Sequence, residues 1–262
     1  MIATDAPIVV KLGGSLLDDA PSREAVLSAI ARGARGGHAI VLVHGGGRRI
    51  DATLAARGIP KRTHEGLRVT DGPTLEVVVA VLQAVNRGLV DDLSDRGVAA
   101  AGLSGVDAGT LRAEVHPPIS GVALGSVGVV ASVDIRVFEA MRSAGLLPVL
   151  APLAAGPDGG PLNVNADAVA AAVATALGAR RLIFLTDVEG VSDALGRRID
   201  DLDSAAARRL LDGPAVSGGM RPKLAACLEA AAGGVGEVVI AGPERQQEAL
   251  AGGRGGTRVV SV

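Results

Sequence analysis

The chain is nearly devoid of aromatic residues, which removes one class of partner. Its 262 residues include no Trp, no Tyr and only two Phe, and its net charge is −2. Proteins that bind single-stranded nucleic acid stack the bases on aromatic side chains and present a basic surface to the phosphates. The composition therefore predicts no nucleic-acid partner and a core built from Val, Leu, Ile and Ala.

Cysteine and histidine are also scarce. Cys227 is the only cysteine, so the chain can form neither an internal disulfide nor a cluster of cysteine metal ligands. The four histidines are scattered at spacings that match no metal-binding motif. The spacing of these residues therefore gives no support for metal catalysis. We predict a buried thiol at Cys227, which lies in an Ala-rich helical stretch.

The sequence lacks a charge-free apolar run of about 18 residues, the length that a membrane-spanning helix needs. Its amino terminus also lacks the basic and then apolar pattern of a signal peptide. We expect a cytoplasmic protein without membrane contacts. With 48% hydrophobic residues, the chain is large enough for one α/β domain or two coupled lobes.

Lysine is rare although basic residues are not. Of the 26 Lys and Arg residues, only Lys11, Lys61 and Lys223 are lysines. The ammonium of lysine is a compact charge, whereas the guanidinium of arginine is a planar fork. In a chain that otherwise uses arginine, the retained lysines indicate positions that need a compact positive charge.

A buried strand followed by a glycine turn occurs twice near the amino terminus. The first strand begins at Ile8 and runs into KLGGS at 11–15, where Ser15 is the expected N-cap of a helix. The second strand, 39–43, runs into HGGG at 44–47. The amides of such turns can bind anions, although glycine turns also occur without a ligand, and neither turn has dinucleotide or P-loop spacing. Two turns at strand ends predict a ligand crevice in an open α/β sheet.

Hydrophobic periodicity and breaks at glycine or proline place the other elements. We predict an Ala-rich helix ending at 177 and further helices over 22–36, 48–57, 73–95, 134–144, 201–211 and 223–232. We predict short strands and a hairpin within 98–130, and strands over 147–152, 181–187, 238–240 and 258–262. The apolar stripe of the 73–95 helix is wide, which fits either a subunit interface or a helix buried within its own chain.

Polar residues follow several of these strands. Asn163, Asn165 and Asp167 alternate before the Ala-rich helix, where they either line a site or cap the helix. Further polar groups end the 181–187 strand, and two glycines precede Lys223 at the start of its helix. A glycine turn and a lysine at a helix start form a second candidate anion site.

Six motifs occur in order along the chain. They are KLGGS at 11–15, HGGG at 44–47, GLRVTD at 66–71, NVNAD at 163–167, LTDVEG at 185–190 and GGMRPK at 218–223. With these motifs the sequence resembles the amino acid kinase family over nearly its whole length, and most closely the members that phosphorylate N-acetyl-L-glutamate. The resemblance implies an α/β fold, an open three-layer αβα sandwich with a mainly parallel central sheet. It also implies two lobes, 1–178 for acyl-amino-acid binding and dimerisation and 179–262 for ATP binding.

The resemblance further implies transfer of the γ-phosphoryl group of MgATP to the side-chain carboxylate of N-acetyl-L-glutamate, a step of arginine biosynthesis. The catalytic residues that it implies are Lys11 and Lys223, with Asp167 orienting both lysines. Phosphoryl transfer needs mainly positioning and positive charge around the moving group, so two lysines suit the reaction. Mg²⁺ would be held largely by the ATP phosphates and water.

The binding residues implied by the resemblance fall into two groups. Those for the acyl amino acid are Gly45, Gly46, Arg68, Asn163 and Asn165. Those for the nucleotide are Gly13, Gly14, Thr186, Asp187, Val188, Gly190, Gly218, Gly219 and Met220. Arg68 would clamp the α-carboxylate of the substrate, because a guanidinium can donate two parallel hydrogen bonds to a carboxylate.

Two positions depart from the family pattern. Arg48 follows the second glycine turn where the family usually has proline, and the polar stretch 63–65 precedes the GLRVTD motif. Both lie beside the expected acyl-amino-acid pocket, so a kinase acting on a carrier-protein-linked aminoadipate or glutamate is an alternative.

A non-catalytic amino-acid sensor on the same fold is a second alternative. Such a sensor would be expected to lose Lys11, Lys223 or Asp167, and all three are present. The GLRVTD and NVNAD motifs disfavour kinases of this fold that act on other small molecules, and the missing dinucleotide fingerprint disfavours a dehydrogenase. Arginine-inhibited members carry an additional N-terminal helix, whereas the first strand begins here at Ile8, so we expect a homodimer insensitive to arginine.

Overall fold

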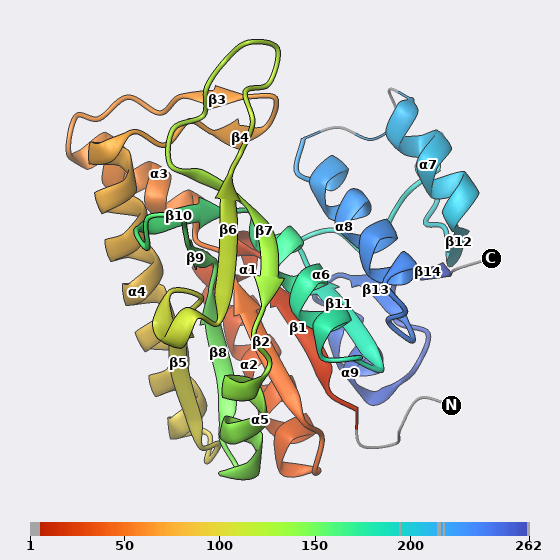
Figure 1. Cartoon of the computed structure of the whole chain (residues 1–262). Coiled ribbons are helices and arrows are strands. Elements are labelled where there is room, and N and C mark those ends of the chain that lie inside the picture. Colours follow the sequence, from red (N-terminus) through yellow and green to blue (C-terminus); the bar gives the residue numbers. More distant parts are fainter. Residues whose placement is uncertain (1–5, 194, 214–215, 217, 261–262) are drawn as a thin grey trace.

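The computed structural model of the protein describes residues 6–193, 195–213, 216 and 218–260. The strands of its main sheet are β1 (Ile8–Leu12), β2 (Ile40–His44), β5 (Ala100–Ser104), β8 (Leu147–Ala151), β11 (Arg181–Leu185), β12 (Asp201–Asp203), β13 (Val238–Ala241) and β14 (Thr257–Val260). They lie in the order β12-β14-β13-β11-β1-β2-β8-β5 (Figure 1). Every neighbouring pair is parallel except β13 and β14.

Helices cover both faces of this sheet (Figure 1). One face carries α2 (Ala20–Arg35), α4 (Gly72–Asp95) and α9 (Gln246–Ala251). The other carries α5 (Arg136–Ser143), α6 (Ala166–Ala176) and α8 (Met220–Ala232), with α7 (Ser204–Asp212) packed on α8. Two shorter helices, α1 (Gly14–Asp18) and α3 (Gly47–Ala56), begin directly after β1 and β2. The predicted three-layer αβα sandwich with a mainly parallel sheet is confirmed.

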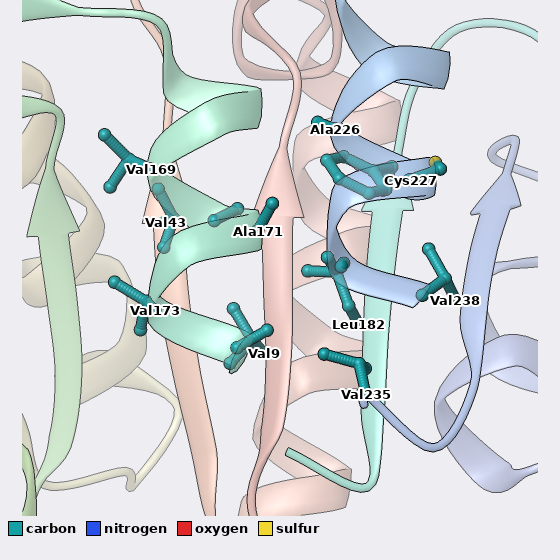
Figure 2. Close-up of a cluster of buried hydrophobic side chains, with 14 of the residues drawn as sticks. Val9, Val43, Val169, Ala171, Val173, Leu182, Ala226, Cys227, Val235 and Val238 are labelled. Carbon is teal, nitrogen blue, oxygen red and sulfur yellow. The ribbon is translucent and has the colours of Figure 1, made fainter. Parts of the chain in front are cut away.

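Each face of the sheet carries its own apolar cluster. Because successive side chains of a strand point to opposite faces, Val9 of β1 belongs to one cluster and Val10 to the other. Figure 2 shows the first cluster, in which residues of α6 and α8 pack on β1, β2, β11 and β13. The buried hydrophobic residues of the described chain are Val, Leu, Ile and Ala, apart from Phe138, Phe184 and Cys227, as the composition predicts.

A small barrel adjoins the carboxyl ends of the sheet strands. Its strands are β6 (Leu111–Val115), β7 (Val127–Val133), β9 (Leu153–Ala155) and β10 (Pro161–Val164). β6 and β7 pair antiparallel, which confirms the hairpin expected within 98–130, whereas β9 and β10 were not predicted. A short 3₁₀ turn, η1 (Asp107–Gly109), precedes β6, and a separate hairpin is formed by β3 (Thr63–His64) and β4 (Leu67–Arg68).

Several element boundaries differ from the prediction. The helix expected over 201–211 begins at Ser204, because Asp203 caps it by accepting a hydrogen bond from Ala206 N at 2.6 Å. Ser15 is not an N-cap, since α1 already begins at Gly14. α8 begins at Met220 rather than at Lys223. The last strand is described as far as residue 260, so the end of the strand predicted over 258–262 lies outside the described residues.

By length and composition alone, α4 could cross a membrane, and it is the one helix of the described ranges that could. The sequence criterion of a charge-free run does not detect it, because residues such as Glu76 and Arg87 interrupt the run. Its inward face, which includes Val78, Leu82 and Leu89, is buried, and the helix packs on β5, β8 and α3. A core helix of this kind passes the same length and composition test.

Candidate active site

The candidate site lies where β11, β1 and β2 end side by side (Figure 1). The turns that follow these strands are joined by backbone hydrogen bonds. Gly13 N donates to Leu185 O at 2.9 Å, and Gly45 N donates to Leu12 O at 3.2 Å. The two glycine turns found in the sequence therefore form one continuous rim at the carboxyl edge of the sheet, as expected for a ligand crevice.

Two lysines share one carboxylate oxygen at this rim. Lys11 Nζ lies 2.8 Å from Asp167 Oδ1, and Lys223 Nζ lies 3.1 Å from the same atom. All three residues are buried. Asp167 stands on the first turn of α6, which Asn165 caps by accepting hydrogen bonds from Asp167 N and Ala168 N. Two ammonium groups with one carboxylate leave one net positive charge, which suits binding of an anion.

The ionisation of this cluster follows from its contacts. Burial raises the pKa of Asp167, but the two adjacent ammonium groups outweigh burial and hold the pKa below its ordinary value. Burial, together with the charge on Lys11, lowers the pKa of Lys223, and Asp167 opposes this shift. Lys223 Nζ also lies 5.4 Å from the centre of the Phe184 ring, within the range of a cation–π contact.

A cavity of about 240 Å³ opens beside the cluster. Eight of the residues implied by the family resemblance line it: Lys11, Gly14, Gly45, Gly46, Arg68, Asn163, Asn165 and Asp167. They come from four segments that are far apart in sequence, and the structure brings them together. A wider hollow of about 1130 Å³, lined in part by Pro7, Ile40 and Leu147, lies at the opposite, amino ends of the strands.

Arg68 presents an unused donor at this cavity. Its Nη2 is paired with Asp51, which also accepts from Lys61 Nζ at 2.7 Å. Its Nη1 is buried and has no hydrogen-bond partner among the described residues. A buried donor without a partner is costly, so this arrangement fits a site that receives an acceptor such as a carboxylate.

The asparagines of the NVNAD motif have different surroundings. Asn163, on β10 of the barrel, donates from Nδ2 to Thr70 Oγ1 at 3.1 Å. Asn165 lines the cavity, but its Oδ1 already caps α6. Both interpretations of this motif therefore hold, since one residue caps the helix while the group lines a cavity.

Seven of the nine residues predicted to bind the nucleotide, all except Gly13 and Gly14, lie after β11 or at the start of α8. Thr186 Oγ1 donates to Asp187 Oδ1 at 3.1 Å, and Val188 is exposed. Gly190 has φ 143°, and a Cβ there would meet Thr257 Oγ1 at 2.4 Å, so its glycine has a structural reason. Gly218 and Gly219 precede α8, whose first residue is Met220. None of these seven residues belongs to the lining of the 240 Å³ cavity.

The surroundings of Gly14 fit a phosphate group. A Cβ on Gly14 would lie 3.6 Å from Gly47 N and 4.0 Å from Gly46 N, so the space above this glycine is bordered by backbone amides. Amides converging on an open space form an anion cradle. Within the described ranges no group of three or more His, Cys, Asp or Glu side chains could hold a metal ion.

A buried polar network supports the second glycine turn. His44 is fully buried; its Nδ1 lies 3.0 Å from Gly45 O, and its Nε2 lies 3.1 Å from Asn86 Nδ2. Asn86 Nδ2 also donates to Val149 O at 2.8 Å. Burial lowers the pKa of His44 to about 4, so the ring is neutral at pH 7, with Nδ1 donating and Nε2 accepting.

Sequence reasoning missed Asp51 and Asn86. An acidic residue on a helix reads as a solvated charge, and nothing in the local pattern links Asp51 to Arg68. Gly47, which also lines the cavity, could have been found from the unbroken glycine run that contains it. The prediction of a buried thiol at Cys227 is confirmed.

Comparison with known proteins agrees with this geometry. Residues 6–242 match the model of the amino acid kinase family. The chain is 42% identical to the acetylglutamate kinase of Solibacter usitatus over 97% of this chain and 99% of that protein. It is 44% identical to the acetylglutamate kinase of Rubrobacter xylanophilus over 96% of each chain.

A solved structure agrees in fold. The crystal structure of smu.665 from Streptococcus mutans UA159 superposes with a TM-score of 0.84 at 31% identity, covering 97% of this chain and 98% of that one. With its glycine turns, its two buried lysines and these relatives, the chain belongs to the amino acid kinase family.

Proposed function

We propose that this protein transfers the γ-phosphoryl group of ATP to the side-chain carboxylate of N-acetyl-L-glutamate and so forms an acyl phosphate. The observation that carries the proposal is the pair Lys11 and Lys223, held on one oxygen of Asp167 between two amide-lined turns. The relatives named acetylglutamate kinase, which match the chain over nearly its full length, support the substrate.

The lysines act on charge rather than on protons. Negative charge spreads over the equatorial oxygens of the moving phosphoryl group, and buried ammonium groups stabilise it more strongly than water does. Lys11 and Lys223 would stand on either side of that group, while the amide of Gly14 would hold phosphate oxygens. The amide of Gly13, which was also predicted to do so, already donates to Leu185 O and shapes the turn instead. ATP would supply the phosphoryl group, and its phosphates together with water would hold most of the Mg²⁺ coordination.

Asp167 would position the lysines and not accept a proton. The attacking group is itself a carboxylate, which has no proton to lose at neutral pH. The pKa of Asp167 also lies below its ordinary value, so it stays negative and keeps both ammonium groups in place.

The acyl amino acid would occupy the 240 Å³ cavity. Arg68 would use its unpaired Nη1 for the α-carboxylate while Asp51 fixes Nη2. Asn163 would hydrogen-bond the substrate, and Gly46 would offer its backbone amide. The amide of Gly45 already donates to Leu12 O, so Gly45 would contribute by shaping the turn. The proposal keeps the lobe division at residues 178 and 179, although one sheet crosses it through the β1–β11 pair.

A homodimer and a cytoplasmic location complete the proposal. The half-buried outer residues of α4, such as Leu75 and Val79, continue the apolar stripe beyond its buried face. Such a face suits contact with a second copy of the chain. Light scattering on the purified protein would test this assembly, and a monomer at micromolar concentration would contradict it.

The function is tested by trapping the acyl phosphate with hydroxylamine. N-acetyl-L-glutamate, free glutamate, aspartate and N-acetyl-aminoadipate are compared, each with MgATP. The proposal predicts ATP-dependent hydroxamate with N-acetyl-L-glutamate alone. Silence on all four substrates by a protein that still binds ATP would contradict it and favour a carrier-linked acceptor or a sensor.

A further inference from the structure

An ion pair crosses the candidate site from one turn to another. Arg48 Nη2 lies 3.7 Å from Asp187 Oδ2. Arg48 stands on the first turn of α3, after β2, and Asp187 follows β11. Because β1 lies between these two strands (Figure 1), the pair passes over the end of β1 and its turn at Gly13 and Gly14.

The carboxylate end of this pair is attached to that same turn. Burial raises the pKa of Asp187, but hydrogen bonds from its own backbone, Ser15 and Thr186, together with the charge on Arg48, outweigh burial and lower the pKa. Ser15 immediately follows Gly14 in the chain. The Arg48 guanidinium therefore lies near Ser15, directly after the Gly13–Gly14 turn.

The pair is too loose to serve mainly for stability. The side chains of Arg48 and Asp187 are 65% and 53% exposed, and exposed pairs contribute little to folding. The neighbouring Arg49, in contrast, lies 2.8 Å from Asp18 Oδ1 and also donates to Leu17 O. Arg49 is thus fixed by close contacts, whereas Arg48 is free to exchange one anionic partner for another.

The charge of the site leaves a place for another cation. Lys11 and Lys223 against Asp167 leave one net positive charge, and Arg68 and Lys61 against Asp51 leave another. In the described part of the chain, the charge of Arg48 is paired with Asp187. The phosphates of a nucleotide together with a carboxylate substrate carry more negative charge than the two clusters can balance.

We propose that Arg48 is a phosphate-binding residue, which leaves Asp187 for the terminal phosphates when a nucleotide enters. This inference rests on the proposed function, because it requires nucleotide at the Gly13–Gly14 turn.

Titration calorimetry with the full chain tests the inference. Wild type, Arg48→Gln and Arg48→Pro are titrated with AMP and with the magnesium complex of AMP-PNP. Proline is tolerated on the first turn of a helix, and circular dichroism verifies folding. Arg136→Gln is the matched control, since Arg136, the first residue of α5, is an exposed arginine paired with Asp134.

We expect both Arg48 variants to raise the Kd for AMP-PNP about tenfold, the effect of losing one charge-assisted hydrogen bond. The Kd for AMP and the behaviour of Arg136→Gln should stay at wild-type values. An unchanged Kd for AMP-PNP in Arg48→Gln, or an equal loss for AMP, would overturn the inference while leaving the proposed function intact. A wild-type protein that binds neither nucleotide would overturn the proposed function itself.

Discussion

Lys11 and Lys223 donate to the same oxygen, Asp167 Oδ1, at 2.8 and 3.1 Å, although 211 residues of the chain lie between the two lysines. Each ammonium repels the other, and the single carboxylate keeps them together in a buried place. Burying these three charges costs folding free energy. Their presence in the core therefore indicates that they serve the function of the site.

Replacing the shared carboxylate tests the electrostatic balance. Asp167→Asn leaves two buried ammonium groups without a counter-charge, and we expect a loss of about 3 kcal/mol in the free energy of unfolding. Urea unfolding at pH 7 measures the change. Asp212→Asn, an exposed residue at the end of α7, is the control and should be near neutral. Equal midpoints for both variants would show that Asp167 does not hold the lysines.

Arg68→Ala should change the KM for one substrate and not the KM for the other. The variant loses the guanidinium that faces the cavity, so we expect the KM for N-acetyl-L-glutamate to rise by about a hundredfold or more, with little change in the KM for ATP. Steady-state kinetics with each substrate varied in turn measures both constants. An equal rise in the two constants would mean that Arg68 is not the carboxylate clamp.

Gly14→Ala probes the anion cradle without disturbing the fold. The new methyl would meet no atom closer than 3.6 Å in the described structure, so we expect a melting temperature near that of wild type. It would fill space bordered by the Gly46 and Gly47 amides, and the KM for ATP should rise about tenfold or more. Gly72→Ala, where a Cβ meets nothing within 4 Å, should leave the KM for ATP unchanged. The cradle assignment fails if the two variants have the same KM.

His44 predicts a pH dependence of stability. Its pKa falls from 6.5 to about 4 on folding because burial disfavours the charged ring. The unfolded chain therefore binds a proton at pH 5 that the folded chain does not, and stability falls as the pH drops below 6.5. Between pH 7 and pH 5 the contribution is about 2 kcal/mol.

Urea unfolding at the two pH values measures this effect. His44→Gln should remove the His44 part of the difference, whereas His38→Gln, at an exposed position, should retain it. Equal pH dependence in wild type and His44→Gln would contradict the assignment of a buried, neutral imidazole.

The sequence predicts much of the sheet and part of the site. Strands such as β1 and β2 have local signals, namely β-branched residues followed by glycine, and the rarity of lysine singles out Lys11 and Lys223. The prediction that Ser15 is an N-cap was wrong, because α1 already begins at Gly14.

Other parts depend on contacts between distant segments. Asn86 on α4 meets His44 on β2, and a Cβ on Gly102 would lie 1.9 Å from Asn86 Oδ1, so β5 requires glycine there. No periodicity encodes such a contact. The pairing of Asp51 with Arg68 is invisible in the sequence for the same reason.

The most direct test of the account is the turnover number of Lys223→Ala with N-acetyl-L-glutamate and MgATP at saturation. The account predicts a fall in kcat of about a hundredfold or more, with the circular dichroism spectrum of the wild type. Lys61→Ala, which removes the exposed third lysine, is the comparison and should keep most of its turnover. A wild-type kcat in Lys223→Ala would contradict the claim that the shared-carboxylate lysines perform the phosphoryl transfer.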